Sequence, residues 1–240
     1  MDPAPPPDFD DWQDSYRESI ERAVPFLPSG HDFFVQTKAE ELLSVAARRL
    51  GPTSTLHALD VGCGLGLAHP HLAPSLGLLE GADVAEETIA RARTANPAVR
   101  YHAYDGERLP LDDWAVDLTF AMGVVHHVPP GRWAAFLTEL ARVTRPGGLV
   151  ALVEPNPLNP ISRLGASRCE FDRDANFLRA PALRAIATAV GLERVESRYI
   201  LFFPFEVPAR RRFERAMWRL AIGAQYIVAG RVSSPASSPG

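Results

Sequence analysis

The feature that most constrains the fold is an alternation, from residue 56 onward, of short apolar runs with longer amphipathic stretches. Short apolar runs bounded by turn residues are typical of buried strands, and the stretches between them carry apolar residues at helical spacing. Strands that alternate with helices of about 10–15 residues form βαβ units and favour a mainly parallel sheet. The sequence therefore predicts an α/β fold with helices on both faces of the sheet. The expected strands are 56–61, 78–84, 99–104, 116–122, 148–153, 192–202 and 224–229.

We expect one folded domain, residues 11–231, between disordered tails at 1–10 and 232–240 that are rich in proline or serine. The domain is predicted to consist of an N-terminal helical lid, a sheet core and a loop on one side of the core, at 11–50, 55–155 and 156–180. The expected helices are 11–27, 32–50, a short or irregular one at 67–76, 86–95, 132–144, 181–190 and 208–221.

Net charge, apolar runs and cysteine content limit the classes of function that the chain can have. The net charge of −4 gives no overall basic field, so we expect no nucleic-acid partner. No apolar run reaches the roughly 18 residues of a transmembrane helix, and the first ten residues do not resemble a secretory signal. With only Cys63 and Cys169, we expect a cytoplasmic protein whose two thiols stay outside any disulfide. Monomer and dimer both stay open.

A glycine-rich turn follows the first expected strand. Asp60 ends the strand, and glycines occupy positions 62, 64 and 66. Glycines let a turn be tight and let a ligand approach the backbone. A dinucleotide fingerprint would need a third glycine at position 67, which is leucine. The Asp60 carboxylate suits a ligand with a positive group there, such as the amino group of a methionine moiety. It suits a pyrophosphate poorly, which argues against a nicotinamide oxidoreductase.

Two further carboxylates end the next two expected strands. Asp83 can accept hydrogen bonds from both hydroxyls of a ribose, and its alternative role is to cap the helix that begins near Ala85. Asp105 can accept from an adenine amine, and its alternative role is an ordinary Asp-Gly turn with Gly106. Because carboxyl ends of parallel strands meet at one edge of a sheet, we expect the three acidic residues to converge.

Together these motifs resemble a known family. LDVGCGLG, GADVAEETI, YDGERLPLDD and VDLTFAMGVVHHV are similar, in order and spacing, to the core of class I S-adenosylmethionine-dependent methyltransferases, and RVTRPGGLVALVEP to the segment around that family's fifth strand. The resemblance implies a Rossmann-like seven-stranded sheet with an antiparallel last strand, and S-adenosylmethionine as cofactor. The cofactor-binding residues that we expect are Asp60, Gly62, Gly64, Gly66, Asp83, Val84, Asp105, Gly106, Met122 and Tyr16.

Three residues are candidate bases. A hydroxyl or amine acceptor must lose a proton, so a nearby base can assist. His126 and His127 follow the fourth expected strand, and Glu154 ends the fifth. A histidine pair is common at this place in the family, including in members without an assigned base, so a structural role stays open. Glu154 can instead hold the following loop by hydrogen bonds.

The acceptor site is expected beneath the N-terminal helices and the segment 154–180, and the alternative is a long loop packed on the sheet edge. The expected substrate-binding residues are Phe33, Gln36, Asn156 and Arg163. No metal site is expected, since His69 and His71 lack a further nearby ligand and are interpreted as surface histidines.

An arginine-rich helix at 210–219 has three possible roles. It can contact an anionic membrane, accept an acidic substrate, or expose one solvated face while Phe213, Met217 and Leu220 pack inward. We favour the solvated face.

The predicted function is methyl transfer to a small-molecule acceptor, with oxygen favoured over nitrogen and carbon, in specialised-metabolite or lipid biosynthesis. The alternative is a methyltransferase-like scaffold that binds the cofactor for a role other than methylation.

Overall fold

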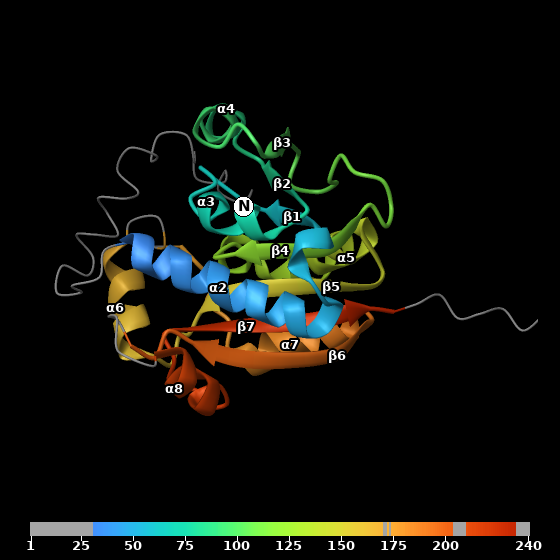
Figure 1. Ribbon diagram of the computed structural model, residues 1–240. Coiled ribbons are helices and arrows are strands. Elements are labelled where there is room, and N and C mark those ends of the chain that lie inside the picture. The colour runs from blue at the N-terminus through green and yellow to red at the C-terminus, as the bar shows by residue number, and fades with distance from the viewer. Residues whose placement is uncertain (1–30, 170–171, 173, 204–209, 234–240) are drawn as a thin grey trace, which may run out of the picture.

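The computed structural model describes residues 31–169, 172, 174–203 and 210–233. Seven strands form one sheet in the order β3-β2-β1-β4-β5-β7-β6 (Figure 1). β7 runs antiparallel to both of its neighbours, and the other pairings are parallel. The predicted fold class is confirmed. The strands are β1 (His57–Val61), β2 (Leu78–Asp83), β3 (Arg100–Ala103), β4 (Val116–Met122), β5 (Thr144–Pro155), β6 (Leu192–Ile200) and β7 (Gln225–Val232).

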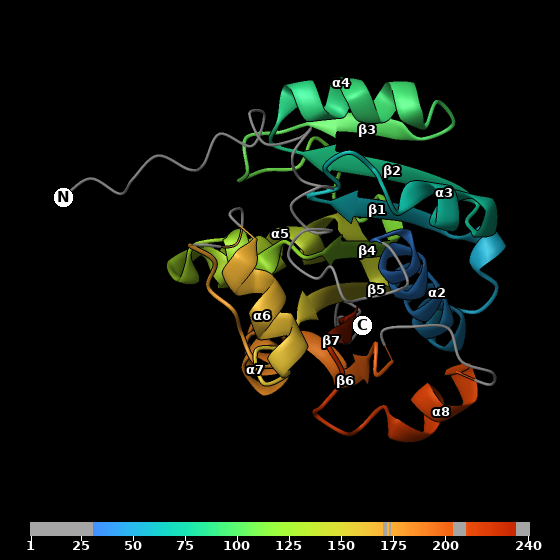
Figure 2. The ribbon, with the colours of Figure 1, turned by 90° about the vertical axis from the view of Figure 1, so that its left-hand side faces the viewer.

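Helices cover both faces of this sheet (Figures 1 and 2). One face packs against α2, α3 and α4, and the other packs against α5 and α7. The described helices are α2 (His31–Leu50), α3 (His69–Leu72), α4 (Glu86–Ala95), α5 (Trp133–Val143), α6 (Pro160–Arg168), α7 (Ala180–Ala189) and α8 (Arg210–Met217), with short 3₁₀ turns η1 (Thr53–Thr55), η2 (Ala73–Ser75), η3 (Val125–His127) and η4 (Pro130–Arg132). None of these helices has the length and apolar character of a membrane span.

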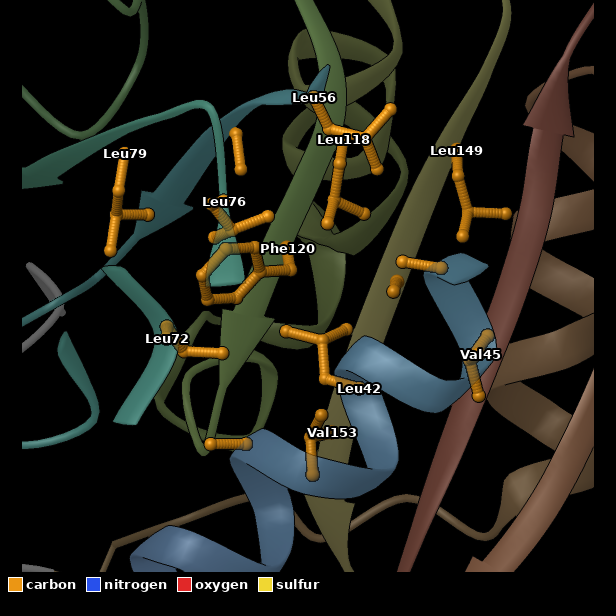
Figure 3. Packing of buried hydrophobic residues seen from close by; sticks show 14 of the residues in the cluster. Leu42, Val45, Leu56, Leu72, Leu76, Leu79, Leu118, Phe120, Leu149 and Val153 are labelled. Atoms are coloured by element: carbon orange, nitrogen blue, oxygen red, sulfur yellow. The ribbon is translucent and has the colours of Figure 1, made fainter. Parts of the chain in front are cut away.

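The longest helix, α2, is held by an apolar stripe. Ala39, Leu42, Val45 and Ala46 are almost completely buried, at the spacing that one helical face requires. Figure 3 shows Leu42 directed toward Phe120 of β4 and Val153 of β5, with Val45 of the same helix beside β7. Truncating a fully buried leucine of this kind to alanine costs about 2–5 kcal/mol. Burial of this stripe fixes the orientation of α2, so that Lys38 lines the same cavity as Asp60 near the end of β1.

The order of the strands locates the site. β1 and β4 are neighbours at the centre of the sheet. From β1 the chain continues to β2 and β3 on one side, and from β4 it continues to β5 on the other, so the strand order reverses between β1 and β4. Ligands of open α/β sheets bind beyond the carboxyl ends of the strands at such a switch point. The loops after β1, β2 and β4 meet there.

Several predicted boundaries were wrong. β5 begins four residues before the expected 148, β6 ends at Ile200, and β7 extends to Val232. The expected helix at 67–76 is two short pieces, α3 and η2, because two prolines interrupt it. The expected helix at 11–27 and both tails lie outside the described residues.

The segment 156–180 was expected to be a loop, but it contains the helix α6. Asn159 starts this helix, since its Oδ1 accepts hydrogen bonds from the N–H groups of Ile161 and Ser162 at 2.9 and 3.1 Å. Pro160 follows at the first helical position, where the missing N–H costs nothing. An asparagine cap followed by proline was the sequence signal for this helix.

Candidate functional site

A cavity of about 590 Å³ opens beyond the carboxyl ends of β1, β2 and β4. It is lined by the loops that follow these strands and β3, by Val35 and Lys38 of α2, and by part of α5. Its wall contains eight of the ten residues that were expected to bind the cofactor, namely Asp60, Gly62, Gly64, Asp83, Val84, Asp105, Gly106 and Met122. Tyr16 lies outside the described residues, and Gly66 does not line the cavity.

Two glycines shape the wall next to β1. Gly62 has φ +75°, and a Cβ there would come within 2.5 Å of the Val124 side chain, so the turn and the β4 loop approach more closely than any other residue allows. Gly64 has φ +51°, and a Cβ there would meet nothing within 4 Å. Gly64 therefore leaves its backbone open to a ligand. Gly66 instead allows close packing, because a Cβ at this position would lie 2.5 Å from the Tyr101 hydroxyl and 2.8 Å from Nδ1 of His69.

Asp60 is buried at the base of the cavity. Its Oδ2 lies 3.1 Å from Nε2 of His69, and its Oδ1 is buried with no hydrogen-bond partner among the described residues. His69 is completely buried and also lies 2.5 Å, Nδ1 to hydroxyl, from Tyr101. The interpretation of His69 as a surface histidine was therefore wrong. His69 orients Asp60 and leaves Oδ1 directed to a further donor.

Lys38, the only lysine of the chain, lines the same cavity from α2. Burial lowers its pKa from the ordinary range, while the negative charges of Asp60 and Glu154 act in the opposite direction. Lys38 was not identified from the sequence. Its signal was weak, because the amphipathic pattern of α2 alone does not show that one polar position faces a cavity.

Asp83 connects two walls of the cavity. Its Oδ2 accepts a hydrogen bond from the Gly64 N–H at 2.7 Å, and its Oδ1 accepts one from the Ala85 N–H at 3.0 Å. Burial raises the pKa of Asp83, and the two backbone hydrogen bonds oppose that shift. The N-cap residue of α4 is Ala85, so Asp83 is not the capping residue itself but binds both the glycine turn and the N–H of that N-cap residue.

Asp105 is exposed at the rim. Its Oδ1 accepts hydrogen bonds from the N–H groups of Glu107 and Arg108, both at 2.8 Å, and these bonds lower its pKa. The expected alternative, an Asp-Gly turn, is therefore present. The same residue lines the cavity, so the turn also positions its carboxylate there.

Glu154 is almost completely buried and organises the loop after β4. Its Oε1 accepts hydrogen bonds from the N–H groups of Val124 and Val125 at 3.0 and 2.8 Å, and its Oε2 lies 2.6 Å from Nδ1 of His126. Both carboxylate oxygens are thus engaged with the protein. Glu154 does not line the cavity, so its contacts favour a positioning role over that of a base.

The two histidines differ in environment. His126 is buried, with Nε2 3.5 Å from Oδ1 of Asp172, and its pKa is raised to about 9: burial would lower it, but the charges of Glu154 and Asp172 outweigh that effect. His127 lines the cavity, and burial together with the charge of His126 lowers its pKa to about 4. At neutral pH the first is an imidazolium and the second a neutral imidazole. Asp172 was not identified from the sequence, since it is 45 positions from His127.

The residues expected to bind the substrate lie apart. Phe33 packs edge-to-face on Phe34 beside the core, and the exposed Gln36 donates to Glu40 at 3.1 Å. Neither lines a described cavity. The Asn156 amide donates to the carbonyls of Ala221 and Gly223 and accepts from the Leu158 N–H, so its hydrogen bonds are used within the protein.

Arg163 lines a second cavity of about 670 Å³, formed by α6, by residues 155–157 before it, and by Cys169, Asp172, Ala175 and Phe177. Asp172 belongs to its wall, and Oδ1 of Asp172 lies 3.6 Å from Nε2 of His127, which lines the first cavity. Asp172 and His127 therefore stand between the two cavities.

Known proteins share this sequence pattern and fold. A methyltransferase-domain family model matches residues 59–152. The chain is 27% identical over 184 residues to a ubiquinone biosynthesis O-methyltransferase of Rhizobium leguminosarum, which covers 71% of this chain and 72% of that protein. It is 31% identical over 195 residues to a malonyl-[acyl-carrier protein] O-methyltransferase of Erwinia billingiae, which covers 80% of this chain and 72% of that protein.

Among solved structures, the fold is similar to a chain from the complex between the Haloferax volcanii Trm112 methyltransferase activator and a methyltransferase. The TM-score is 0.65 at 21% identity, over 94% of this chain and 98% of that chain. At 21% identity this similarity shows that the two chains share a fold.

Proposed function

Because the chain belongs to the class I S-adenosylmethionine-dependent methyltransferases, we propose that it transfers a methyl group to an oxygen atom of a small-molecule acceptor. The observation that carries this proposal is the convergence of Asp60, Gly64, Asp83 and Asp105 on one cavity, with the neutral His127 in its wall. S-adenosylmethionine, when bound, supplies a methyl group that is already activated on a sulfonium.

The residues of the cavity fit the methionine part of this cofactor. Asp60 Oδ1 is a buried acceptor without a donor, and a buried unsatisfied carboxylate oxygen costs free energy until a donor reaches it. We assign it to the cofactor's ammonium group. The Lys38 ammonium, on the same wall, is the cation for the cofactor's carboxylate. The open backbone at Gly64 leaves room for the methionine carbon atoms next to these groups.

The remaining assignments concern the adenosine part. Each carboxylate oxygen has two acceptor positions, so Asp83 can hold its backbone partners and still accept from the ribose hydroxyls. Asp105 can accept from the adenine amine through Oδ2, because its turn uses Oδ1. Val84, Gly106 and Met122 complete the wall.

His127 is the candidate base for the acceptor. It is neutral at pH 7 and lines the cavity, whereas His126 is protonated and held between two carboxylates. A hydroxyl that attacks a sulfonium methyl must lose its proton, and a nearby neutral imidazole can take it. The low pKa of His127 makes it a weak base, which suits a hydroxyl acceptor that is itself acidic, such as a phenol; a carboxylic acid is already ionised at neutral pH and needs no base. The two relatives named above are both O-methyltransferases, which supports oxygen as the acceptor atom.

The test is release of S-adenosylhomocysteine. The purified chain is incubated with S-adenosylmethionine and panels of phenols, carboxylic acids and amines, and the product is followed by mass spectrometry. We expect acceptor-dependent release with oxygen acceptors. Tight cofactor binding without release for any acceptor would favour the alternative of a non-methylating scaffold, and release with amines alone would contradict the oxygen assignment.

A further inference from the structure

Exposed apolar side chains are concentrated on one surface. Eight large hydrophobic residues are exposed among the described residues, and two of them, Leu67 and Val84, line the cofactor cavity. Five of the other six belong to α6, to the turn before it, or to the loop that precedes β7. These five, Leu158, Ile161, Leu164, Leu220 and Ile222, are between 37% and 60% exposed. We call them, with the residues between them, the α6 surface.

Hydrogen bonds hold the two segments of the α6 surface together. The Asn159 Nδ2 donates to the Ile222 carbonyl at 2.6 Å, and the Asn156 Nδ2 donates to the carbonyls of Ala221 and Gly223. The Ser162 hydroxyl donates to the Ala224 carbonyl at 2.5 Å. Residues more than 60 positions apart in the sequence therefore form one surface. The expectation that Leu220 packs inward was wrong, since half of it is exposed.

The same surface is basic. Residues 156–168 contain two arginines, Arg163 and Arg168, and no acidic residue, and Arg219 directly precedes Leu220. Arg163, Arg168 and Arg219 are exposed, and Arg219 lies over the Trp218 ring at 4.7 Å. A chain of net charge −4 thus gathers basic charge beside its exposed apolar side chains.

A path leads from this surface to the site. The helix α6 also lines the cavity of about 670 Å³, through Ser162, Arg163, Ala166, Ser167 and Arg168. Asp172 lines the same cavity, and its Oδ1 lies 3.6 Å from Nε2 of His127. Figure 2 shows α6 beside the carboxyl ends of the central strands, which is the edge of the sheet where the first cavity lies.

We propose that the α6 surface binds the surface of an anionic lipid membrane, and that the acceptor is an amphiphile that enters from there through the second cavity. Apolar side chains that insert into the headgroup region, with arginines that meet anionic lipids, are the two features that interfacial binding requires. An acidic partner protein would satisfy the arginines but would not need five exposed apolar side chains. The entry of the acceptor rests on the proposed function, whereas binding to the membrane does not.

The test is co-sedimentation of the full chain with vesicles of phosphatidylcholine, with and without phosphatidylglycerol. We expect binding only where phosphatidylglycerol is present, and weaker binding at high salt. The double variant Ile161→Ser/Leu164→Ser and the variant Arg163→Gln should each reduce the apparent affinity, the double variant by about tenfold or more.

Matched controls change the same residue types elsewhere. Trp114→Ser removes the exposed hydrophobic residue that lies outside both the cavity and the α6 surface, and Arg184→Gln removes an exposed arginine of α7. Both controls should bind vesicles as the wild type does, and all variants should keep their melting temperature and their affinity for S-adenosylmethionine. Absence of binding to phosphatidylglycerol vesicles, or equal binding by the double variant, would overturn the proposal. So would binding to an acidic carrier protein that the arginine change abolishes, if vesicles are not bound.

Discussion

Nδ1 of His126 lies 2.6 Å from Oε2 of Glu154, and the other oxygen of Glu154 holds the N–H groups of Val124 and Val125. This pair connects the end of β5 to the loop after β4, from which His127 reaches the cavity. The neighbouring imidazolium also keeps His127 neutral. We therefore propose separate tasks for the adjacent histidines: His126 positions the loop, and His127 meets the acceptor.

Substitution of the two histidines should separate these tasks. We expect His127→Ala to lower kcat by about 10²–10⁴-fold, the usual contribution of a general base, with little change in melting temperature. His126→Ala leaves the buried Glu154 without its cationic partner and should cost about 3–5 kcal/mol of stability. Steady-state kinetics and thermal denaturation of both variants measure the difference. Full activity of His127→Ala would remove it from the mechanism.

The pH profile follows from the same pair. His127, with a pKa of about 4, stays neutral through the weakly acidic range, so activity should not fall near pH 6.5 as it would for an ordinary histidine base. His126, with a pKa of about 9, contributes stability that is fully present below its unfolded pKa of about 6.5 and is lost as the pH rises through 9. The measurements are kcat/KM and denaturant midpoints across this range. A half-loss of kcat/KM near pH 6.5 would contradict the assignment of the base.

Asp83→Ala should weaken S-adenosylmethionine binding at least about tenfold, because it removes the ribose acceptor and frees the glycine turn. Calorimetric titration measures the affinity, and circular dichroism checks that the variant remains folded. The matched control is Asp112→Ala, an exposed aspartate remote from the cavity wall, which should bind as the wild type does. Equal affinities for all three proteins would exclude the ribose assignment.

Lys38→Met tests the carboxylate assignment with a pair of ligands. We expect about a tenfold loss of affinity for S-adenosylhomocysteine, which carries the carboxylate. Methylthioadenosine lacks the amino acid moiety, so its affinity should be unchanged. A parallel loss for both ligands would mean that Lys38 supports the cavity without contacting the carboxylate.

Glu80 of β2 makes a separate contribution to stability. It accepts from His57 and His102 at 2.7 and 2.5 Å; although burial would raise its pKa, these hydrogen bonds hold it below its ordinary value of 4.5. The resulting stabilisation is present above the unfolded pKa and is lost as the pH falls through the folded one. Glu80→Gln should therefore cost about 1–3 kcal/mol at pH 7 and progressively less below pH 4.5. A constant difference between pH 3 and 7, measured by urea denaturation, would contradict this ionic contribution.

The sequence predicted the parts of the molecule that depend on local pattern. The strand 116–122 matches β4 at both ends, since alternation and turn residues bound it. Asp60, Asp83 and Asp105 line one cavity, as expected, because each lies at or just after the carboxyl end of a strand and parallel strands end at one edge.

The remaining features depend on contacts between distant residues. His69 is buried because Tyr101, 32 positions away, and Asp60 surround its ring, and nothing near His69 in the sequence indicates this. Asn156, which was expected to meet a substrate, lines the second cavity, and its hydrogen-bond partners in the loop before β7 could not be read from the local sequence. Asp172 and Lys38 likewise reach the site from segments whose local pattern is that of an ordinary turn and helix. Tertiary packing alone brings such residues to the site.

Calorimetric titration of the chain with S-adenosylmethionine tests the central claim most directly. We expect one molecule bound per chain with a dissociation constant of about micromolar order, and loss of that binding in the double variant Asp60→Asn/Asp83→Ala while the fold is retained. A wild-type protein that shows no binding at about millimolar cofactor, or a folded double variant that binds as the wild type does, would contradict the assignment of this cavity.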